Sequence, residues 1–169
     1  ELSARELIKA AGLDPDKDIK GENLGVGDTG SAFADKHIDA AVMLGALGMG
    51  GVVEPSTLGL VEFIDIPDDI IEKVIKQSPY WFKFTIPANT YKGQPAPVKT
   101  YAGPNIITVT AEIPDDLVYL MTKTAFENKK DLVTISSNMQ NMTPEGAKNI
   151  MIPLHPGAMR YYKEIGVIK

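Results

Sequence analysis

The segment Gly25–Gly30 reads Gly-Val-Gly-Asp-Thr-Gly and matches the pattern G-x-G-x-x-G. In a dinucleotide site, these glycines let the backbone approach the pyrophosphate at the N-terminus of a helix. The full pattern also needs an acidic residue about 20 positions further on, at the end of the next strand. Here no carboxylate lies between Leu44 and Glu54. A glycine-rich turn is the favoured interpretation, and a nucleotide- or dinucleotide-binding enzyme domain stays as the alternative.

Residues Asp28, Thr29 and Gly30 also spell the D-T-G motif of aspartic proteases. That chemistry needs two carboxylates that share a proton, from two lobes or a dimer. The motif occurs once, but a dimer could supply the second aspartate, so the protease is rejected only because the flanking chain has an α/β pattern where a β-rich lobe is required. A capping role is therefore expected for Asp28. The two histidines, His37 and His155, lack partners at ligand spacing, and the absence of cysteine excludes thiolate ligands and disulfides. We expect no metal and no cofactor.

Aromatic residues gather between residues 80 and 101. Ligand pockets favour aromatic side chains with polar tips and often lie between domains. Tyr80 and Tyr91 therefore fit either a core or the wall of a ligand cleft. Phe82 and Phe84 are expected in the core, because alternation along a strand places one set of side chains inside.

These residues require helices and strands to position them. The spacing of apolar residues predicts a helix over Leu2–Ala11, which Gly12 ends. Two further helices share the start signal Ile-Pro-Asp-Asp, at Ile66–Asp69 and Ile113–Asp116. Proline suits the first helical position, and aspartates in the first turn complement the positive end of the helix dipole.

Apolar stretches between the helices predict strands. Alternation of strands and helices in residues 1–80 is typical of a parallel sheet covered by helices. The stretch Pro87–Pro104, which carries prolines and glycines, predicts a boundary between two lobes. The predicted strands are Asp18–Val26, Ile38–Leu44, Leu60–Ile64, Trp81–Ile86 and Ile106–Thr110, with short helices at Ser31–His37 and Val52–Ser56 and a final segment at Pro156–Ile165.

The composition limits the class of protein. With 44% hydrophobic and 23% charged residues, a chain of 169 residues is globular and has one domain or two small lobes. The net charge is −5 without a clustered basic face, so a nucleic-acid partner is not expected. No apolar run reaches the roughly 20 residues that cross a bilayer, and no signal peptide opens the chain.

Several motifs occur in an order that resembles one family. Ile152–Gly166 is similar to the family's closing signature, and Thr85–Gln94 is similar to its block Ile-Pro-Ala-Gly-Thr-Tyr with Gly-Gln. Ile38–Ala40 resembles its strand entry, and Val118–Asn128 its late helix. The family is the TAXI class of solute-binding proteins, which serve TRAP transporters. Residues 45–49 differ from the family's proline-bearing loop.

The resemblance implies an α/β fold of the periplasmic-binding-protein type II. Residues 1–86 would form one nearly complete second lobe, 87–104 a hinge or crossover, and 105–169 a return to a truncated first lobe. The implied function is that of an extracytoplasmic, periplasmic receptor and not an enzyme. It would capture a small organic anion, such as glutamate or a related carboxylate, and deliver it to a TRAP permease.

The expected site follows from strand geometry. Ligands in open α/β sheets lie beyond the carboxyl ends of the strands, and Gly45 directly follows the predicted strand Ile38–Leu44. We therefore expect the solute to contact the turn and the two tyrosines that fit a cleft wall. The predicted ligand-binding residues are Gly45, Ala46, Leu47, Tyr80 and Tyr91.

Members of the TAXI class are longer than this chain. They begin with a secretion signal and most of a first lobe, and they carry a Gly-Ser-Gly-Thr turn, suited to an anion, before the helix that corresponds to Ser3–Ala11. We expect this chain to be a C-terminal fragment that binds its solute weakly by itself. A homodimer could then cover Leu117, Leu120 and Met121. A structural module without a ligand is a third interpretation.

Overall fold

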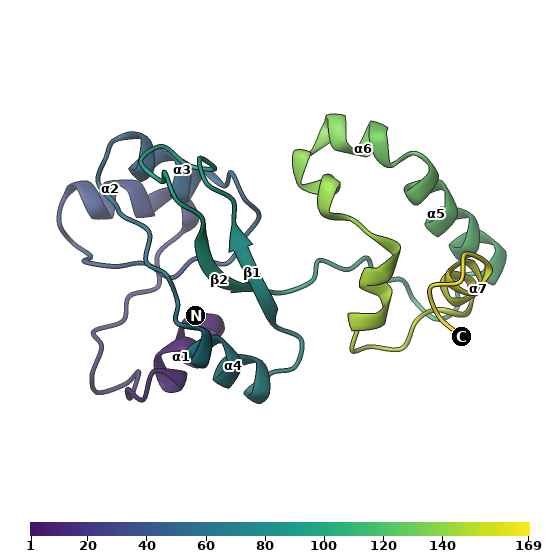
Figure 1. The fold of residues 1–169 in the computed structure, drawn as a ribbon, viewed down its shortest axis with the longest axis horizontal. Coiled ribbons are helices and arrows are strands. Elements are labelled where there is room, and N and C mark those ends of the chain that lie inside the picture. The colour runs from purple at the N-terminus through teal and green to yellow at the C-terminus, as the bar shows by residue number, and fades with distance from the viewer. The chain divides into compact units, whose positions relative to one another are not determined.

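The computed structural model describes residues 1–169. The chain divides into two compact units, Glu1–Ala102 and Gly103–Lys169, which are called unit 1 and unit 2 below. Figure 1 shows the helices and strands of both units. Because the positions of the units relative to each other are not determined, each is described by itself.

Unit 1 is built on a hairpin of two antiparallel strands, β1 (Phe82–Ile86) and β2 (Val98–Ala102). Helices α1 (Leu2–Ala10) and α4 (Asp68–Gln77) lie side by side, and α4 contacts β2 (Figure 1). Buried residues from these elements form the core, in which the rings of Trp81 and Tyr101 meet edge to face at 5.0 Å. The core residues are Ala10, Ile71, Val74, Trp81 and Tyr101.

The helices predicted from local signals are confirmed. Helix α1 ends before Gly12, whose φ of +88° suits glycine. Helix α4 carries Asp68 and Asp69 in its first turn, as predicted, although Pro67 occupies the N-cap, one position before the expected one. The apolar stripe of α4 faces the core, because Ile71 and Val74 are spaced three residues apart and are both fully buried.

Short helices complete unit 1. They are the 3-10 turn Val26–Asp28, α2 (Thr29–Ala34) and α3 (Gly50–Thr57), and α2 packs against α3. Gly51 of α3 has no room for a side chain, since a Cβ there would clash with the backbone carbonyl oxygen of Val26. The predicted short helices are thus confirmed with shifted ends.

Most predicted strands are wrong, and no parallel sheet forms. Only Trp81–Ile86 is confirmed, as β1, and its partner β2 lies inside the predicted connection Pro87–Pro104. The other apolar stretches have no neighbouring strand, so many of their side chains are exposed: Leu44 is 62% exposed and Ile107 87%. A strand exists only where another strand satisfies its backbone groups. The stretches that form no strand are Asp18–Val26, Ile38–Leu44, Leu60–Ile64 and Ile106–Thr110.

The aromatic residues are only partly where the sequence predicts them. Phe82 was expected in the core, but it is 40% exposed, and Phe84 is half-buried. Each strand of the hairpin has one neighbour only, so alternation does not bury a complete set of side chains. Residues 87–102 belong to unit 1 because β2 pairs with β1. The assignment of two units to two lobes remains a prediction.

Unit 2 is helical. Its core contains Ala147, Tyr161 and Tyr162, against which Phe126 packs, and the rings of Phe126 and Tyr161 stack with centroids 5.8 Å apart. The final segment predicted at Pro156–Ile165 is a helix. The elements are α5 (Asp115–Glu127), α6 (Lys129–Ile135), two 3-10 stretches (Ser137–Asn141 and Pro144–Asn149) and α7 (Pro156–Glu164).

Helices α5 and α7 approach each other closely at Gly157. A Cβ at Gly157 would lie 2.8 Å from the backbone nitrogen of Tyr119 and closer still to the carbonyl oxygen of Asp115. At the same place, Nδ1 of His155 accepts a hydrogen bond from the Gly157 N–H (3.2 Å) and caps α7. Glycine at position 157 therefore sets the distance between the two helices.

Candidate functional site

A small cavity of about 50 Å³ lies beside the first turn of α1. It brings together three segments that are distant in sequence. They are the start of α1, the carboxyl end of the stretch Ile38–Leu44, and β2 together with Ile66, whose N–H donates to the backbone of β2. The lining residues are Ser3, Val42, Met43, Leu44, Ile66, Thr100 and Tyr101.

Ser3 is the polar group at the centre of this arrangement. The residue is only 8% exposed, its hydroxyl makes no hydrogen bond within the chain, and the hydroxyl oxygen is not fully shielded from solvent. The N-cap residue of α1, Glu1, makes no side-chain capping bond, and the first turn contains no acidic residue. The first N–H groups of a helix lack partners within it and carry its positive end. The site can therefore donate hydrogen bonds to an anionic oxygen.

Tyr101 fixes the first turn of α1 to β2. Its hydroxyl donates a hydrogen bond to the carbonyl oxygen of Ser3 at 2.8 Å. Burial, together with the negative charge of Glu6, raises the pKa of Tyr101 to about 12. The hydroxyl consequently keeps its proton at neutral pH and remains a donor to Ser3.

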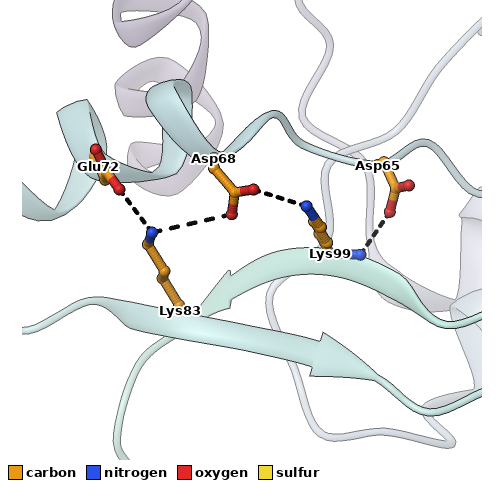
Figure 2. A network of polar contacts seen from close by, with 5 residues as sticks. All are labelled: Asp65, Asp68, Glu72, Lys83 and Lys99. Atoms are coloured by element: carbon orange, nitrogen blue, oxygen red, sulfur yellow. Dashed lines mark hydrogen bonds and ion pairs between the residues drawn. The ribbon is translucent and has the colours of Figure 1, made fainter.

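Two backbone contacts hold Ile66 at the wall of the cavity. The Ile66 N–H donates to the carbonyl oxygen of Lys99 (3.1 Å), and the Lys99 N–H donates to Oδ1 of Asp65 (2.6 Å). Figure 2 shows the bond between Asp65 and the backbone of Lys99. Ile66 is thereby placed next to Thr100, the residue that follows Lys99 in β2.

A charged network on the surface supports this wall (Figure 2). Asp68 at the start of α4 lies 2.7 Å from Nζ of Lys99 and 3.9 Å from Nζ of Lys83, which also binds Glu72 at 2.7 Å. The hydrogen bond from Lys99 holds the pKa of Asp68 below its ordinary value. The two lysines are each paired with a carboxylate, so the network joins α4 to the hairpin and leaves neither lysine free for an anion.

The predicted turn and Tyr91 come together in the structure. Gly45, Ala46 and Leu47 follow Leu44 directly, and the next residue, Gly48, donates its N–H to the hydroxyl oxygen of Tyr91 at 3.1 Å. The ring of Tyr91 is 8% exposed and stacks on Phe63 with centroids 5.1 Å apart. Tyr91 is therefore a buried support of the turn.

Tyr80 lies at the other end of the hairpin, away from Tyr91. Its hydroxyl donates to Oε1 of Glu6 (3.1 Å), and Glu6 also accepts from Ser78 Oγ and Trp81 Nε1, both at 2.6 Å. Burial alone raises the pKa of Glu6, but the hydrogen bonds from Ser78, Trp81 and Tyr80 together outweigh it and lower that pKa. This cluster joins α1 to the chain that follows α4.

The segment Gly25–Gly30 has the chain's own carboxylates against it. A Cβ at Gly25 would lie 2.7 Å from a carboxylate oxygen of Asp28, and one at Gly30 would lie 2.8 Å from that of Glu54. These carboxylates oppose a pyrophosphate by charge and take up space beside two of the glycines. Asp28 is the N-cap of α2, as predicted, but its side chain makes no capping hydrogen bond.

Sequence reasoning did not select the residues that line the cavity. Two signals could have found part of it: Ser3 stands in the first turn of a helix without acidic residues, and Val42–Leu44 end a predicted strand. Thr100 gave no signal, because it fell in a stretch interpreted as a connection, and Tyr101 was noted only as the last member of the aromatic group between residues 80 and 101. Leu44 was used only as the residue before the predicted turn.

The fold of helices with a small sheet is compatible with a fragment of an α/β binding protein. Residues 1–166 match the NMT1-like family, and the chain belongs to that family. It is a solute-binding, non-enzymatic family in the periplasmic-binding-protein type II-like group, and its proteins are typically extracytoplasmic and paired with a membrane transporter. None of the helices has the length and apolar character needed to cross a membrane. The predicted relation to this group is confirmed.

Proposed function

We propose that the chain acts in an extracytoplasmic receptor of the TAXI class. In this proposal it binds a small organic anion, an amino acid such as glutamate or a related carboxylate, and passes it to a TRAP permease. The observation that carries the proposal is the cavity at the start of α1, where the unpartnered Ser3 hydroxyl adjoins backbone N–H groups that no side chain caps.

A carboxylate suits this arrangement because it accepts hydrogen bonds and carries a negative charge. The Ser3 hydroxyl and the first-turn N–H groups of α1 would donate to its oxygens. Hydrogen bonds to a charged group contribute about 1.5–3 kcal/mol each. The positive end of the helix adds a favourable electrostatic interaction.

The turn Gly45–Leu47 would extend the wall of the site. It follows Leu44, which lines the cavity, and Tyr91 supports it through Gly48. The Tyr91 hydroxyl accepts a hydrogen bond from the Gly48 N–H, and in this proposal its O–H would donate to the solute. Tyr80 would contribute only through its ring, because its hydroxyl donates to Glu6.

The same geometry supports binding rather than catalysis. A nucleophilic serine needs a base within hydrogen-bond reach, whereas the Ser3 hydroxyl has no partner in the chain. In the proposed function Ser3 is a donor to the solute and undergoes no reaction.

A panel of thermal-shift measurements tests this function. We expect glutamate and other small carboxylates to raise the melting temperature of the chain, while their neutral amides, ATP and NAD leave it unchanged. Ser3→Ala should weaken carboxylate binding about tenfold, and it should not lower stability because the hydroxyl has no partner to lose. Ser137→Ala, in the exposed part of unit 2, is the control. Stabilisation by ATP or NAD, but by no carboxylate, would support the enzyme alternative.

A further inference from the structure

We infer that α5 carries a docking surface for a second copy of this chain, and that the two α5 helices pair in antiparallel orientation. This inference concerns an interaction surface and does not depend on the proposed solute. Three apolar side chains of α5 lie on one face at helical spacing and are largely exposed. They are called the exposed stripe below: Leu117 is 47% exposed, Leu120 56% and Met121 44%.

The opposite face of α5 is already used inside unit 2. Val118 is buried at 5% exposure. The rings of Tyr119 and Phe126 lie 6.2 Å and 5.8 Å from the ring of Tyr161 on α7. The exposed stripe points away from this contact, because residues three and four positions apart share one face of a helix. The helix therefore has two apolar faces, and unit 2 covers one of them.

Charged side chains at the two ends of the exposed stripe define its occupant. Glu112 lies just before α5, the first turn of α5 adds two aspartates, and no lysine or arginine occurs in residues 103–122. Lys129 and Lys130 lie just beyond the other end, at the start of α6. Neither Glu112 nor the two lysines have an ion-pair partner within the chain. The stripe thus runs from an acidic end to a basic end, both open to a partner.

The same charges set the direction of the second copy. An antiparallel copy places the acidic end of one stripe beside the basic end of the other, whereas a parallel copy places like charges together. Antiparallel helices also bring opposite ends of their dipoles side by side. The chain is therefore complementary to itself in one orientation only, which is what a two-fold interface requires.

One register satisfies the charges and the apolar contacts together. A two-fold axis between Leu120 and Met121 places each of these side chains opposite the other residue of the second copy. The same axis places Glu112 at the level of Lys129 of the second copy, because Glu112 precedes Leu120 by as many positions as Lys129 follows Met121. Each contact occurs twice in the dimer by symmetry.

The length of α5 limits the strength of the dimer. The helix has 13 residues, so at about 1.5 Å per residue the contact is about 20 Å long. A single pair of helices lies at the small end of specific interfaces, which bury roughly 1,200 Å² in total or less. We therefore expect a dimer that dissociates on dilution, with a Kd in the micromolar range or above.

Sedimentation equilibrium of the full chain, from roughly 10 µM to about 1 mM, tests the inference. We expect a reversible equilibrium between monomer and dimer. Leu120→Asp should weaken the dimer at least about tenfold, because it places two unpaired carboxylates at the two-fold axis. Ile135→Asp is the matched control, since Ile135 is 82% exposed in the same unit but lies outside the stripe. A monomer at every concentration, or equal effects of the two substitutions, would overturn the inference.

A charge exchange tests the antiparallel pairing independently. Glu112→Lys and Lys129→Glu should each weaken the dimer about fivefold, because each places like charges together at two symmetric positions. The double variant should regain the wild-type affinity, since it restores opposite charges at both positions. A dimer formed through any other surface would show no such recovery. A double variant that dimerises no better than the single variants would overturn the antiparallel pairing.

Discussion

The same four residues, Ile-Pro-Asp-Asp, span the starts of helices α4 and α5, but the chain anchors the two helices in different ways. Asp68 of α4 binds lysines of the hairpin, and Glu6 binds the residues that follow the helix. The start of α5 also carries an exposed ion pair, between Asp116 and Arg160 of α7 at 2.8 Å, but in addition it meets the backbone of α7 at Gly157. The shared residues set where each helix begins, and the tertiary neighbours decide what holds it in place.

The difference predicts which substitutions each unit tolerates. Side chains on the surface can rotate away from a lost ion pair, so the contacts of Asp68 should contribute little. Backbone atoms cannot rotate away from an added methyl group, so Gly157 should tolerate no change. The cluster around Glu6 should lie between these two cases, because its donors are partly buried.

The largest effect is expected for Gly157→Ala. The added methyl group would meet backbone atoms of α5, and separating the two helices should cost about 3 kcal/mol. Amide hydrogen exchange in α5 and α7 measures this loss. Gly146→Ala is the control, since a Cβ at that position would only reach Thr143 Oγ1 at 3.9 Å, an ordinary contact.

The same variant tests whether the two units are independent in stability. Trp81 is the only tryptophan of the chain and lies in the core of unit 1. We expect the unfolding transition followed by its fluorescence to be unchanged in Gly157→Ala. If the unfolding transition followed by Trp81 shifts as much as the stability of unit 2 falls, the two units unfold together. The comparison of two separate anchoring modes would then fail.

A smaller effect is expected for Glu6→Gln. The substitution removes the negative charge that accepts hydrogen bonds from Ser78, Tyr80 and Trp81. Leaving such donors poorly paired costs about 1–3 kcal/mol. Trp81 fluorescence in a denaturant titration is the measurement. Glu62→Gln, at an exposed position, should be neutral.

The pH dependence of unit 1 gives a second test of the Glu6 cluster. The folded state lowers the pKa of Glu6 below its ordinary value of 4.5. The cluster therefore stabilises the fold above pH 4.5, and this contribution is lost as the pH falls through the lowered pKa. Wild type should lose more stability than Glu6→Gln as the pH is lowered through that range. Parallel pH profiles of the two proteins would contradict this account.

The sequence predicted the starts and ends of helices well and the pairing of strands badly. The helix starts at Asp68 and Asp115 and the stop at Gly12 depend on residues within a turn of one another, so a single sequence contains the signal. The stretch Ile38–Leu44 has the apolar character of a strand, but a strand also needs a partner that the sequence does not identify. β2 was missed because prolines and glycines flank it.

The candidate site was predicted in part for the same reason. Gly45 could be placed next to the site because it follows a predicted strand end. The role of Tyr80 could not be predicted, because its hydrogen-bond partner Glu6 is 74 positions away in the sequence. Ser3 and Tyr101, which meet at the cavity, are 98 positions apart. Contacts at such separations depend on the tertiary structure alone.

The smallest effect is expected for Asp68→Asn. It removes the contacts to Lys99 and Lys83, and salt screens such exposed pairs. We expect a small decrease in melting temperature at low salt that disappears at high salt. Asp69→Asn is the matched control, because it changes the same helix turn but contacts only Lys73 of its own helix at 3.6 Å. Equal effects of the two substitutions at low salt would mean that the hairpin lysines add nothing.

The central claim is that a small carboxylate binds at the start of α1. A ¹H–¹⁵N correlation titration of the chain with isovalerate and with its neutral amide tests it directly, and it detects affinities as weak as millimolar. We predict that isovalerate causes saturable shifts of the backbone N–H signals of Ser3, Ala4 and residues 42–48. The neutral ligand, isovaleramide, should cause none. Saturable shifts confined to Gly25–Gly30, or no saturable shift with the carboxylate, would contradict the account.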